Sequence, residues 1–109
     1  MKRMGMAIGI RPEKIAEYKR LHADAWPGVL RQIRESNIRN YVIYLLEPEN
    51  MLFAHLEYHG DDFDADMARM AEDPETREWW THTDPCQTPL ARAGQLGNWV
   101  QLEEVFFTE

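Results

Sequence analysis

The segment IRNYVIYLLEPENMLFAHLEY, residues 38–58, decides the fold class of this protein. It contains two runs rich in β-branched, aromatic and aliphatic residues, YVIYLL and MLFAHLEY, separated by Glu47-Pro48-Glu49-Asn50. Both runs favour strands because their residue types pack well on a pleated surface. Proline at the second position of a four-residue turn, with asparagine at its end, is typical of a tight reversal. The segment therefore predicts a β-hairpin.

The chain before this hairpin contains one strand pattern and two helix patterns. Residues 3–10 alternate bulky and bare side chains, which predicts a strand with one bulky face. Residues 12–24 follow with a proline and an acid in the first turn of a predicted helix. A second helical piece begins at Pro27, because proline is tolerated in a first turn and breaks an interior one.

The chain after the hairpin returns to helical spacing at residues 61–72. Asp73-Pro74-Glu75 then supplies a cap, a first-turn proline and a first-turn acid for another short helix. Residues 84–98 contain prolines and glycines and predict an irregular loop, and residues 99–107 alternate as a last strand. The order β-α-β-β-α-β predicts an α+β, ferredoxin-like split βαβ fold, an antiparallel sheet with helices on one face.

The other face of that sheet also needs a cover. Aromatic and aliphatic side chains occupy both alternation classes of residues 41–46, so neither face is polar enough to be left in water. A homodimer is the simplest cover. Two sheets that face each other form a dimeric α/β-barrel, whose interior is a natural ligand site.

Length and charge exclude several classes of partner. The 109 residues suit a single domain spanning 1–109, and 12 Lys and Arg against 19 Asp and Glu give a net charge of −7. No basic cluster could bind a phosphate backbone, so we expect neither nucleic acid nor membrane as a partner. The one cysteine, Cys86, permits no intrachain disulfide, and no signal peptide or apolar membrane span is recognisable. We therefore expect a cytoplasmic protein.

Three aromatic or imidazole side chains follow one another at intervals of four, at Tyr18, His22 and Trp26. This spacing predicts a common helical face. Histidine can give and take a proton near neutral pH, and a tyrosine one turn away can orient a substrate oxygen. The alternative is a face packed on the sheet, with the histidine bonded to a backbone carbonyl, and spacing alone leaves both interpretations open.

A tryptophan pair, Trp79-Trp80, is the second candidate feature. Adjacent residues on a helix point about 100° apart, so the two rings could straddle the rim of a cavity. Indole rings stack on the C–H face of a sugar. The alternative places one ring in the core and the other at an interface.

The other tyrosines and histidines give weaker indications. Tyr41 and Tyr44 lie on opposite faces of one strand, so at most one of them reaches a given pocket. His55 and His59 are four apart on a strand, where that spacing does not bring them together. We recognise no metal-ligand, phosphate-loop or nucleotide motif, and we expect neither a metal nor a cofactor.

Taken together, these pieces resemble the L-rhamnose mutarotase family. The matching stretches are YKRLHADAWPGVL at 18–30, NYVIYL at 40–45, the tandem tryptophans and LEEVF at 102–106, in the family's order over nearly the whole chain. The resemblance implies a dimeric α/β-barrel and a cofactor-free enzyme that interconverts the α and β anomers of a 6-deoxy-L-sugar. It also implies that His22 is the proton donor and that the substrate contacts Tyr18, Tyr41, Trp79 and Trp80.

Three alternatives accompany this interpretation. The stretch THTDPCQTPL at 81–90 departs from the Asn-Pro-Asp-containing stretch of better-known rhamnose enzymes, so L-fucose is an alternative substrate to L-rhamnose. Cofactor-free or haem-using monooxygenases are built on the same dimeric barrel, and fold alone does not separate the classes. A non-catalytic dimer that binds a small ligand is the third possibility.

Overall fold

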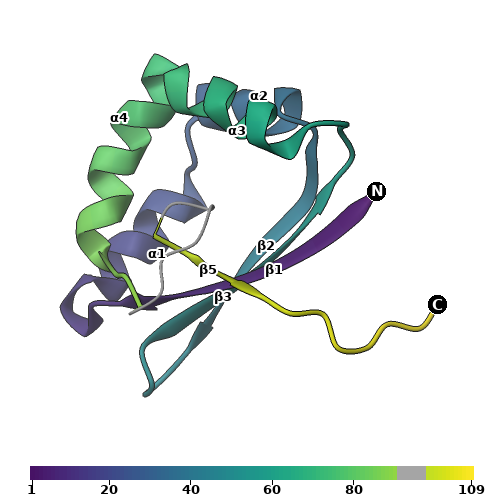
Figure 1. The fold of residues 1–109 in the computed structure, drawn as a ribbon. Coiled ribbons are helices and arrows are strands. Elements are labelled where there is room, and N and C mark those ends of the chain that lie inside the picture. The colour runs from purple at the N-terminus through teal and green to yellow at the C-terminus, as the bar shows by residue number, and fades with distance from the viewer. Residues whose placement is uncertain (91–97) are drawn as a thin grey trace.

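A five-stranded sheet carries all the helices on one of its faces in the part of the chain that the computed structural model describes, residues 1–90 and 98–109 (Figure 1). The strands are β1 (Lys2–Ile10), β2 (Ile38–Leu46), β3 (Met51–Tyr58), β4 (Gln87–Thr88) and β5 (Val100–Leu102). The helices are α1 (Ile15–Ala23), α2 (Pro27–Glu35), α3 (Phe63–Glu72) and α4 (Pro74–Thr83), with short 3₁₀ turns η1 (Pro12–Lys14) and η2 (Asp84–Cys86).

The sheet has the order β2-β3-β1-β4, and β5 pairs with β1 on the same side as β4. Every pairing is antiparallel. The predicted hairpin is confirmed, because β2 ends at Leu46 and β3 begins at Met51. This topology also confirms the predicted α+β, ferredoxin-like fold, with the helices packed on one face of the sheet (Figure 1).

The helices begin where their capping residues predict. The Asp73 carboxylate accepts a hydrogen bond from the backbone N–H of Thr76 at 2.9 Å, and α4 begins at the next residue, Pro74. The Asp62 carboxylate accepts one in the same way from the N–H of Ala65 at the start of α3. Helix α2 begins at Pro27, as predicted. Side-chain caps thus mark the starts of α3 and α4, and a first-turn proline marks the start of α2.

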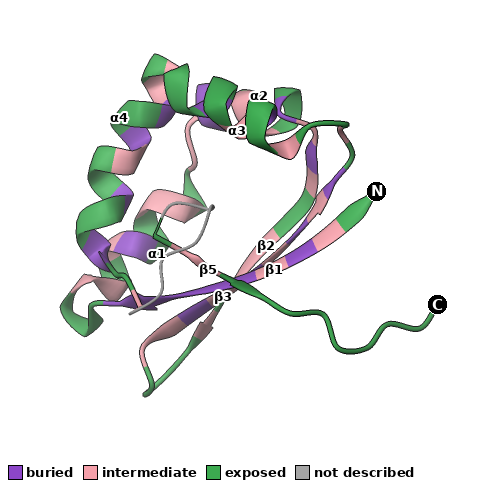
Figure 2. Ribbon diagram, in the orientation of Figure 1, coloured by how far each residue is buried: buried purple, intermediate pink, exposed green. Residues whose placement is uncertain are grey.

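The core lies between the helices and the inner face of the sheet, the face that the helices cover. On β1 the inner side chains Met4, Met6 and Ile8 are buried. Much of this strand carries the colour of buried residues in Figure 2. Two clusters share this core. One consists of Met4, Met6, Ile38, Ala54, Leu56, Tyr58 and Met70, and the other of Ile8, Ile10, Tyr18, Leu52 and Cys86.

The predicted last strand, residues 99–107, is wrong in length. Strand β5 covers only Val100–Leu102, which pairs with Gly5, Met6 and Ala7 of β1. Residues 103–109 then leave the sheet as an extended tail (Figure 1). Alternation predicts an extended backbone, but a strand also needs a partner, and the described residues offer the tail none.

The predicted irregular loop, residues 84–98, is partly wrong. Residues 84–86 form η2, and residues 87–88 form β4 against Gly9 and Ile10. A Cβ atom on Gly9 would lie 2.8 Å from the Thr88 carbonyl oxygen, so the close approach of β4 requires glycine at this position. Residues 91–97 of the predicted loop lie outside the described residues. The predicted helix at 12–24 begins with η1 and continues as α1 to Ala23.

Candidate active site

Helix α1 presents Tyr18 and His22 on one face, one turn apart. Their ring centroids are 4.2 Å apart and the ring planes are inclined by 31°. The helix ends at Ala23, but Trp26 still reaches the same aromatic cluster from the connection between α1 and α2. The common face of Tyr18 and His22 is therefore as predicted, whereas Trp26 joins it across a helix end.

Trp79 of α4 holds this cluster together. Its ring meets the His22 ring edge-on at 5.3 Å between centroids and the Trp26 ring at 5.2 Å. Trp79 is only 6% exposed, so its indole is a packed part of the cluster and not a mobile surface side chain. The Glu75 carboxylate also accepts a hydrogen bond from the Gly28 backbone N–H at 3.1 Å, which ties α4 to the start of α2.

Trp80, the other member of the pair, packs elsewhere. It is partly buried against the core cluster that contains Met4 and Met6 on the inner face of the sheet. The two rings diverge because consecutive helical residues point about 100° apart. On the far side of the cluster, the His82 ring lies 5.5 Å from the Trp26 ring.

The hydrogen bonding of His22 determines which of its ring nitrogens can react. Nδ1 lies 2.8 Å from the Tyr18 carbonyl oxygen, and a carbonyl oxygen only accepts, so Nδ1 carries the proton of this bond. Neutral His22 therefore presents an unprotonated Nε2, for which no hydrogen bond occurs among the described residues. Burial lowers the pKa of His22, and the bond to the carbonyl partly opposes that shift. The imidazolium is thus a stronger acid than in water.

Tyr18 combines a buried ring with a fixed hydroxyl. Gln87 Nε2 donates a hydrogen bond to the Tyr18 hydroxyl oxygen at 3.1 Å, and both residues are buried. Burial raises the pKa of Tyr18, repulsion from Tyr41 raises it further, and the Gln87 bond lowers it. Tyr18 is therefore a neutral hydroxyl at physiological pH. Gln87 was missed in the sequence because it lies in the predicted irregular loop, where no pattern indicates an inward direction.

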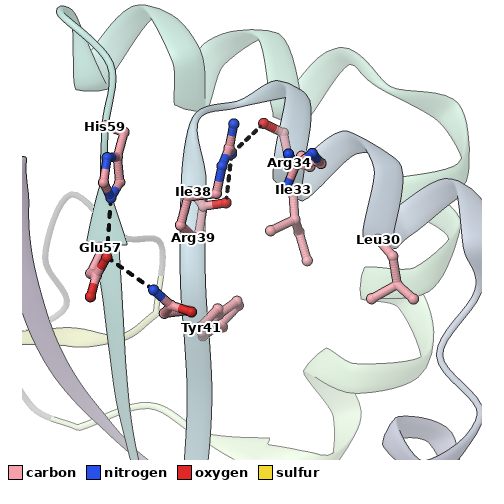
Figure 3. Close-up of a pocket in the computed structure, with 9 residues that line it drawn as sticks. Leu30, Ile33, Arg34, Ile38, Arg39, Tyr41, Glu57 and His59 are labelled. Carbon is pink, nitrogen blue, oxygen red and sulfur yellow. Dashed lines mark hydrogen bonds and ion pairs between the residues drawn. The ribbon is translucent and has the colours of Figure 1, made fainter.

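Tyr41 enters from the sheet. The register of β2 against β3 shifts between Arg39 and Val42, with Asn40 at φ 50°, and Tyr41 follows directly. Figure 3 shows its ring turned toward the same space as Leu30 and Ile33 of α2. The residue is 39% exposed, and desolvation by the protein around it raises the pKa of Tyr41 to about 12.

A cavity of about 460 Å³ opens between α2 and β2, and Tyr41, Leu30 and Ile33 belong to its lining (Figure 3). Its volume falls within the usual range of ligand pockets. Tyr18, His22, Trp79 and Trp80 are not in this lining. Of the predicted site residues, Tyr41 is therefore the one that lines this cavity.

The features of the simpler alternative are also present. The Tyr18 ring belongs to a core cluster, and His22 is bonded to a backbone carbonyl. Neither feature conflicts with a site, because the Tyr18 hydroxyl keeps its own proton to donate and no hydrogen bond to His22 Nε2 occurs among the described residues. The packing instead fixes where these two groups lie.

The remaining tyrosine, cysteine and histidine candidates are not part of the group of rings formed by Tyr18, His22, Trp26 and Trp79. Tyr44 is 63% exposed on the outer face of the sheet, opposite the helices. Cys86 is fully buried, and His59 bonds Glu57 at 3.1 Å. Within residues 1–90 and 98–109, no three His, Cys, Asp or Glu side chains gather in a way that could hold a metal ion. No helix in these ranges is long and apolar enough to cross a membrane.

Comparison with known proteins decides the family. The family model described as L-rhamnose mutarotase matches residues 3–108. The chain belongs to the L-rhamnose mutarotase family. The L-rhamnose mutarotase of Burkholderia ambifaria is 32% identical over 100 residues, which cover 83% of this chain and 93% of that protein. The L-rhamnose mutarotase of Bacillus subtilis is 27% identical over 109 residues, with both chains covered completely. The family predicted from sequence is confirmed, and with it the isomerase class of the enzyme.

Solved structures place the L-rhamnose mutarotase family within a wider fold. The structure of L-rhamnose mutarotase FA22100 from Formosa agariphila has a TM-score of 0.79 and 22% identity, with both chains covered completely. Tetracenomycin F2 cyclase from Streptomyces glaucescens has a TM-score of 0.69 and 16% identity, covering 100% of this chain and 97% of that one. A putative antibiotic biosynthesis monooxygenase from Nitrosomonas europaea has a TM-score of 0.59 and 13% identity, covering 97% of this chain and 100% of that one. One fold thus carries several chemistries, and the functional argument must come from the family and the side chains.

Proposed function

We propose that this protein interconverts the α and β anomers of L-rhamnose, with His22 as the proton carrier. The observation that carries the proposal is the commitment of His22 Nδ1 to the Tyr18 carbonyl, which leaves Nε2 for a substrate in a chain of this family. A group that titrates in the neutral range can act as acid in one direction and as base in the other. Mutarotation requires both directions.

The reaction needs two proton movements. In its protonated form, the imidazolium, His22 gives the Nε2 proton to the ring oxygen while the anomeric hydroxyl loses one to water or another side chain, so that the ring opens to the aldehyde. The C1–C2 bond then rotates, and the same steps in reverse close the ring with either configuration. Neutral His22 recovers its proton in the closing step, so no cofactor is needed.

The other predicted residues have binding roles in this proposal. Tyr18 and Tyr41 hold sugar hydroxyls, which suits them because their raised pKa values keep both phenols neutral. Trp79 and Trp80 offer apolar rings to the C–H and methyl surface of a 6-deoxy sugar. L-Fucose, another 6-deoxy-L-hexose, is the competing substrate, because residues 81–90 depart from the Asn-Pro-Asp-containing stretch of better-known rhamnose enzymes. This segment borders the cluster through His82 and Gln87.

A homodimer completes the proposal. The outer face of the sheet exposes Tyr44 and Leu102, and the tail beyond it exposes Val105, Phe106 and Phe107. These exposed apolar groups support a second copy as the cover, which would form the dimeric α/β-barrel. Light scattering during size-exclusion chromatography tests the dimer. A cytoplasmic location belongs to the same proposal, because a buried and unpaired Cys86 suits a reducing compartment.

The first experiment is anomer exchange measured by NMR magnetisation transfer with L-rhamnose, L-fucose and D-glucose in parallel. We expect acceleration with one 6-deoxy-L-sugar, and a fall of about 10²- to 10⁴-fold for His22→Ala, the usual contribution of a general acid–base group. Lys19→Ala is the control, since Lys19 is exposed on the same helix and belongs to neither the aromatic cluster nor the cavity lining. Unchanged turnover in His22→Ala would reject the role of His22.

Absence of exchange with any sugar would reject the mutarotase proposal itself. Binding of a sugar without exchange would then support the small-ligand-binding alternative. Quinone-forming oxidation of polyphenols, with or without added haem, would support the monooxygenase alternative.

The pH dependence of exchange tests the direction of proton transfer. The pKa of His22 is lowered by burial, so its protonated form is lost as pH rises through a value below the ordinary 6.5. If imidazolium is the acid, kcat/KM falls across that range and the His22→Ala profile is flat there. A rate that rises with pH instead would make neutral His22 the base of the opening step.

A further inference from the structure

Gln87 holds the one polar contact to the Tyr18 hydroxyl that occurs among the described residues. It lies at the start of β4, immediately after η2, and is 7% exposed. Tyr18 is 6% exposed and comes from α1, 69 residues earlier in the chain. A buried amide so placed is costly unless it is bonded, so the contact is a built feature of the fold.

The backbone around Gln87 is fastened at three consecutive residues. The Cys86 carbonyl accepts a hydrogen bond from the Arg11 N–H at 2.8 Å, and Gln87 pairs with Ile10. Thr88 lies so close to Gly9 that no side chain would fit there. These backbone contacts fix the position from which the Gln87 side chain reaches Tyr18, although residues 84–98 were predicted to be an irregular loop.

The direction of the hydrogen bond decides what Tyr18 can do. A phenol has one proton to donate and two lone pairs to accept with. Gln87 Nε2 donates, so it occupies a lone pair and leaves the Tyr18 proton for another acceptor. A sugar oxygen is such an acceptor. If residue 87 were an acceptor instead, it would compete with the sugar for that proton.

We propose that Gln87 is a positioning residue, which holds the Tyr18 hydroxyl so that its proton is donated to the sugar. This inference rests on the proposed function, because Tyr18 must bind a sugar hydroxyl. It adds a residue from β4 to a site otherwise drawn from α1, β2 and α4. Gln87 acts through Tyr18 and not by touching the reacting atoms.

A double-mutant cycle on the full-length protein separates this role from a structural one. Gln87→Met keeps the length of the side chain and removes the donor, and we expect about a tenfold fall in kcat/KM for the preferred sugar, mainly through KM. In a Tyr18→Phe background the same substitution should have almost no further effect, because the hydroxyl is gone. Thr88→Val is the matched control, since Thr88 is exposed and adjacent.

Gln87→Glu tests the direction of the bond. A carboxylate at this position accepts the Tyr18 proton, so its activity relative to wild type should fall as pH rises through the pKa of the new carboxyl group. When protonated, the carboxyl can donate as the amide does, and activity should recover on acidification. A constant ratio to wild type across this range would overturn the proposed direction.

The outcomes separate the two proposals. If Gln87→Met lowers kcat/KM equally with and without the Tyr18 hydroxyl, or does not lower it at all, the positioning role is overturned. Normal anomer exchange by the wild-type protein would still uphold the mutarotase function in that case. No exchange by the wild-type protein would overturn both. The ¹³Cζ resonance of Tyr18, assigned by its loss in Tyr18→Phe, reports the hydrogen bond directly. It should shift in folded Gln87→Met and stay in place in Thr88→Val.

Discussion

The two faces of the sheet follow one alternating pattern and have opposite surroundings. On the inner face Met4, Met6 and Ile8 are exposed by 2%, 3% and 0%, whereas on the outer face Tyr44 and Leu46 are exposed by 63% and 43%. Both sets are apolar or aromatic. The difference arises because the helices in residues 1–90 and 98–109 cover only the inner face (Figure 1).

The contrast between the two faces distinguishes what sequence alternation determines from what tertiary packing determines. Alternation determines which side chains share a face, because the pleat repeats every two residues. It does not determine what covers that face. On the inner side the cover is α1 to α4, which also bring the aromatic cluster together. On the outer side we propose a second copy of the chain.

The largest expected effect on stability comes from the inner face. Ile8→Ala removes a fully buried side chain of β1 and should lower the free energy of unfolding by about 2–5 kcal/mol. Chemical denaturation followed by circular dichroism measures this loss. Leu46→Ala, an aliphatic truncation on the outer face, should cost less. Equal losses would show that the two faces are equally covered in solution.

A smaller effect on the free energy of unfolding is expected from Asp66, a buried carboxylate at the edge of the same core. The Asp66 carboxylate accepts hydrogen bonds from Tyr58 and Asn37 and pairs with Arg69, and these partners lower the pKa of Asp66. Its contribution to stability is therefore present above the ordinary pKa of the carboxyl and is lost as pH falls through the lower, folded value.

Asp66→Asn should be less stable than wild type at neutral pH by less than Ile8→Ala, and the difference should shrink on acidification. Unfolding by urea at a series of pH values measures it. Asp64→Asn, on an exposed position of the same helix, is the control. A stability difference that grows toward acid would contradict a lowered pKa of Asp66 in the folded protein.

The smallest effect on the monomer is expected from the outer face. Tyr44→Ala should change the free energy of unfolding by no more than about 0.5 kcal/mol at low protein concentration, as surface substitutions usually do. At higher concentration wild type should gain stability relative to the variant, because dimer formation adds to it. Thermal unfolding at several concentrations, with sedimentation, tests this. Equal, concentration-independent stability in both proteins would argue against the dimer.

The sequence by itself determined the elements and their order. Strand β1, the hairpin and the helix starts at Pro27 and Pro74 are local features, because alternation, proline placement and Asp73 act within a few residues. The shared face of Tyr18 and His22 is local for the same reason. The family could also be identified from short stretches, because they follow one another in a characteristic order.

Only the tertiary structure decided what those residues meet. Trp79 reaches His22 and Gln87 reaches Tyr18 across 57 and 69 positions of the chain, and β5 stops at Leu102 because only part of the tail finds a partner strand. The free nitrogen of His22 likewise depends on a hydrogen-bond geometry that no spacing rule states. Long-range contacts depend on how whole helices and strands pack together, so a local sequence pattern does not predict them.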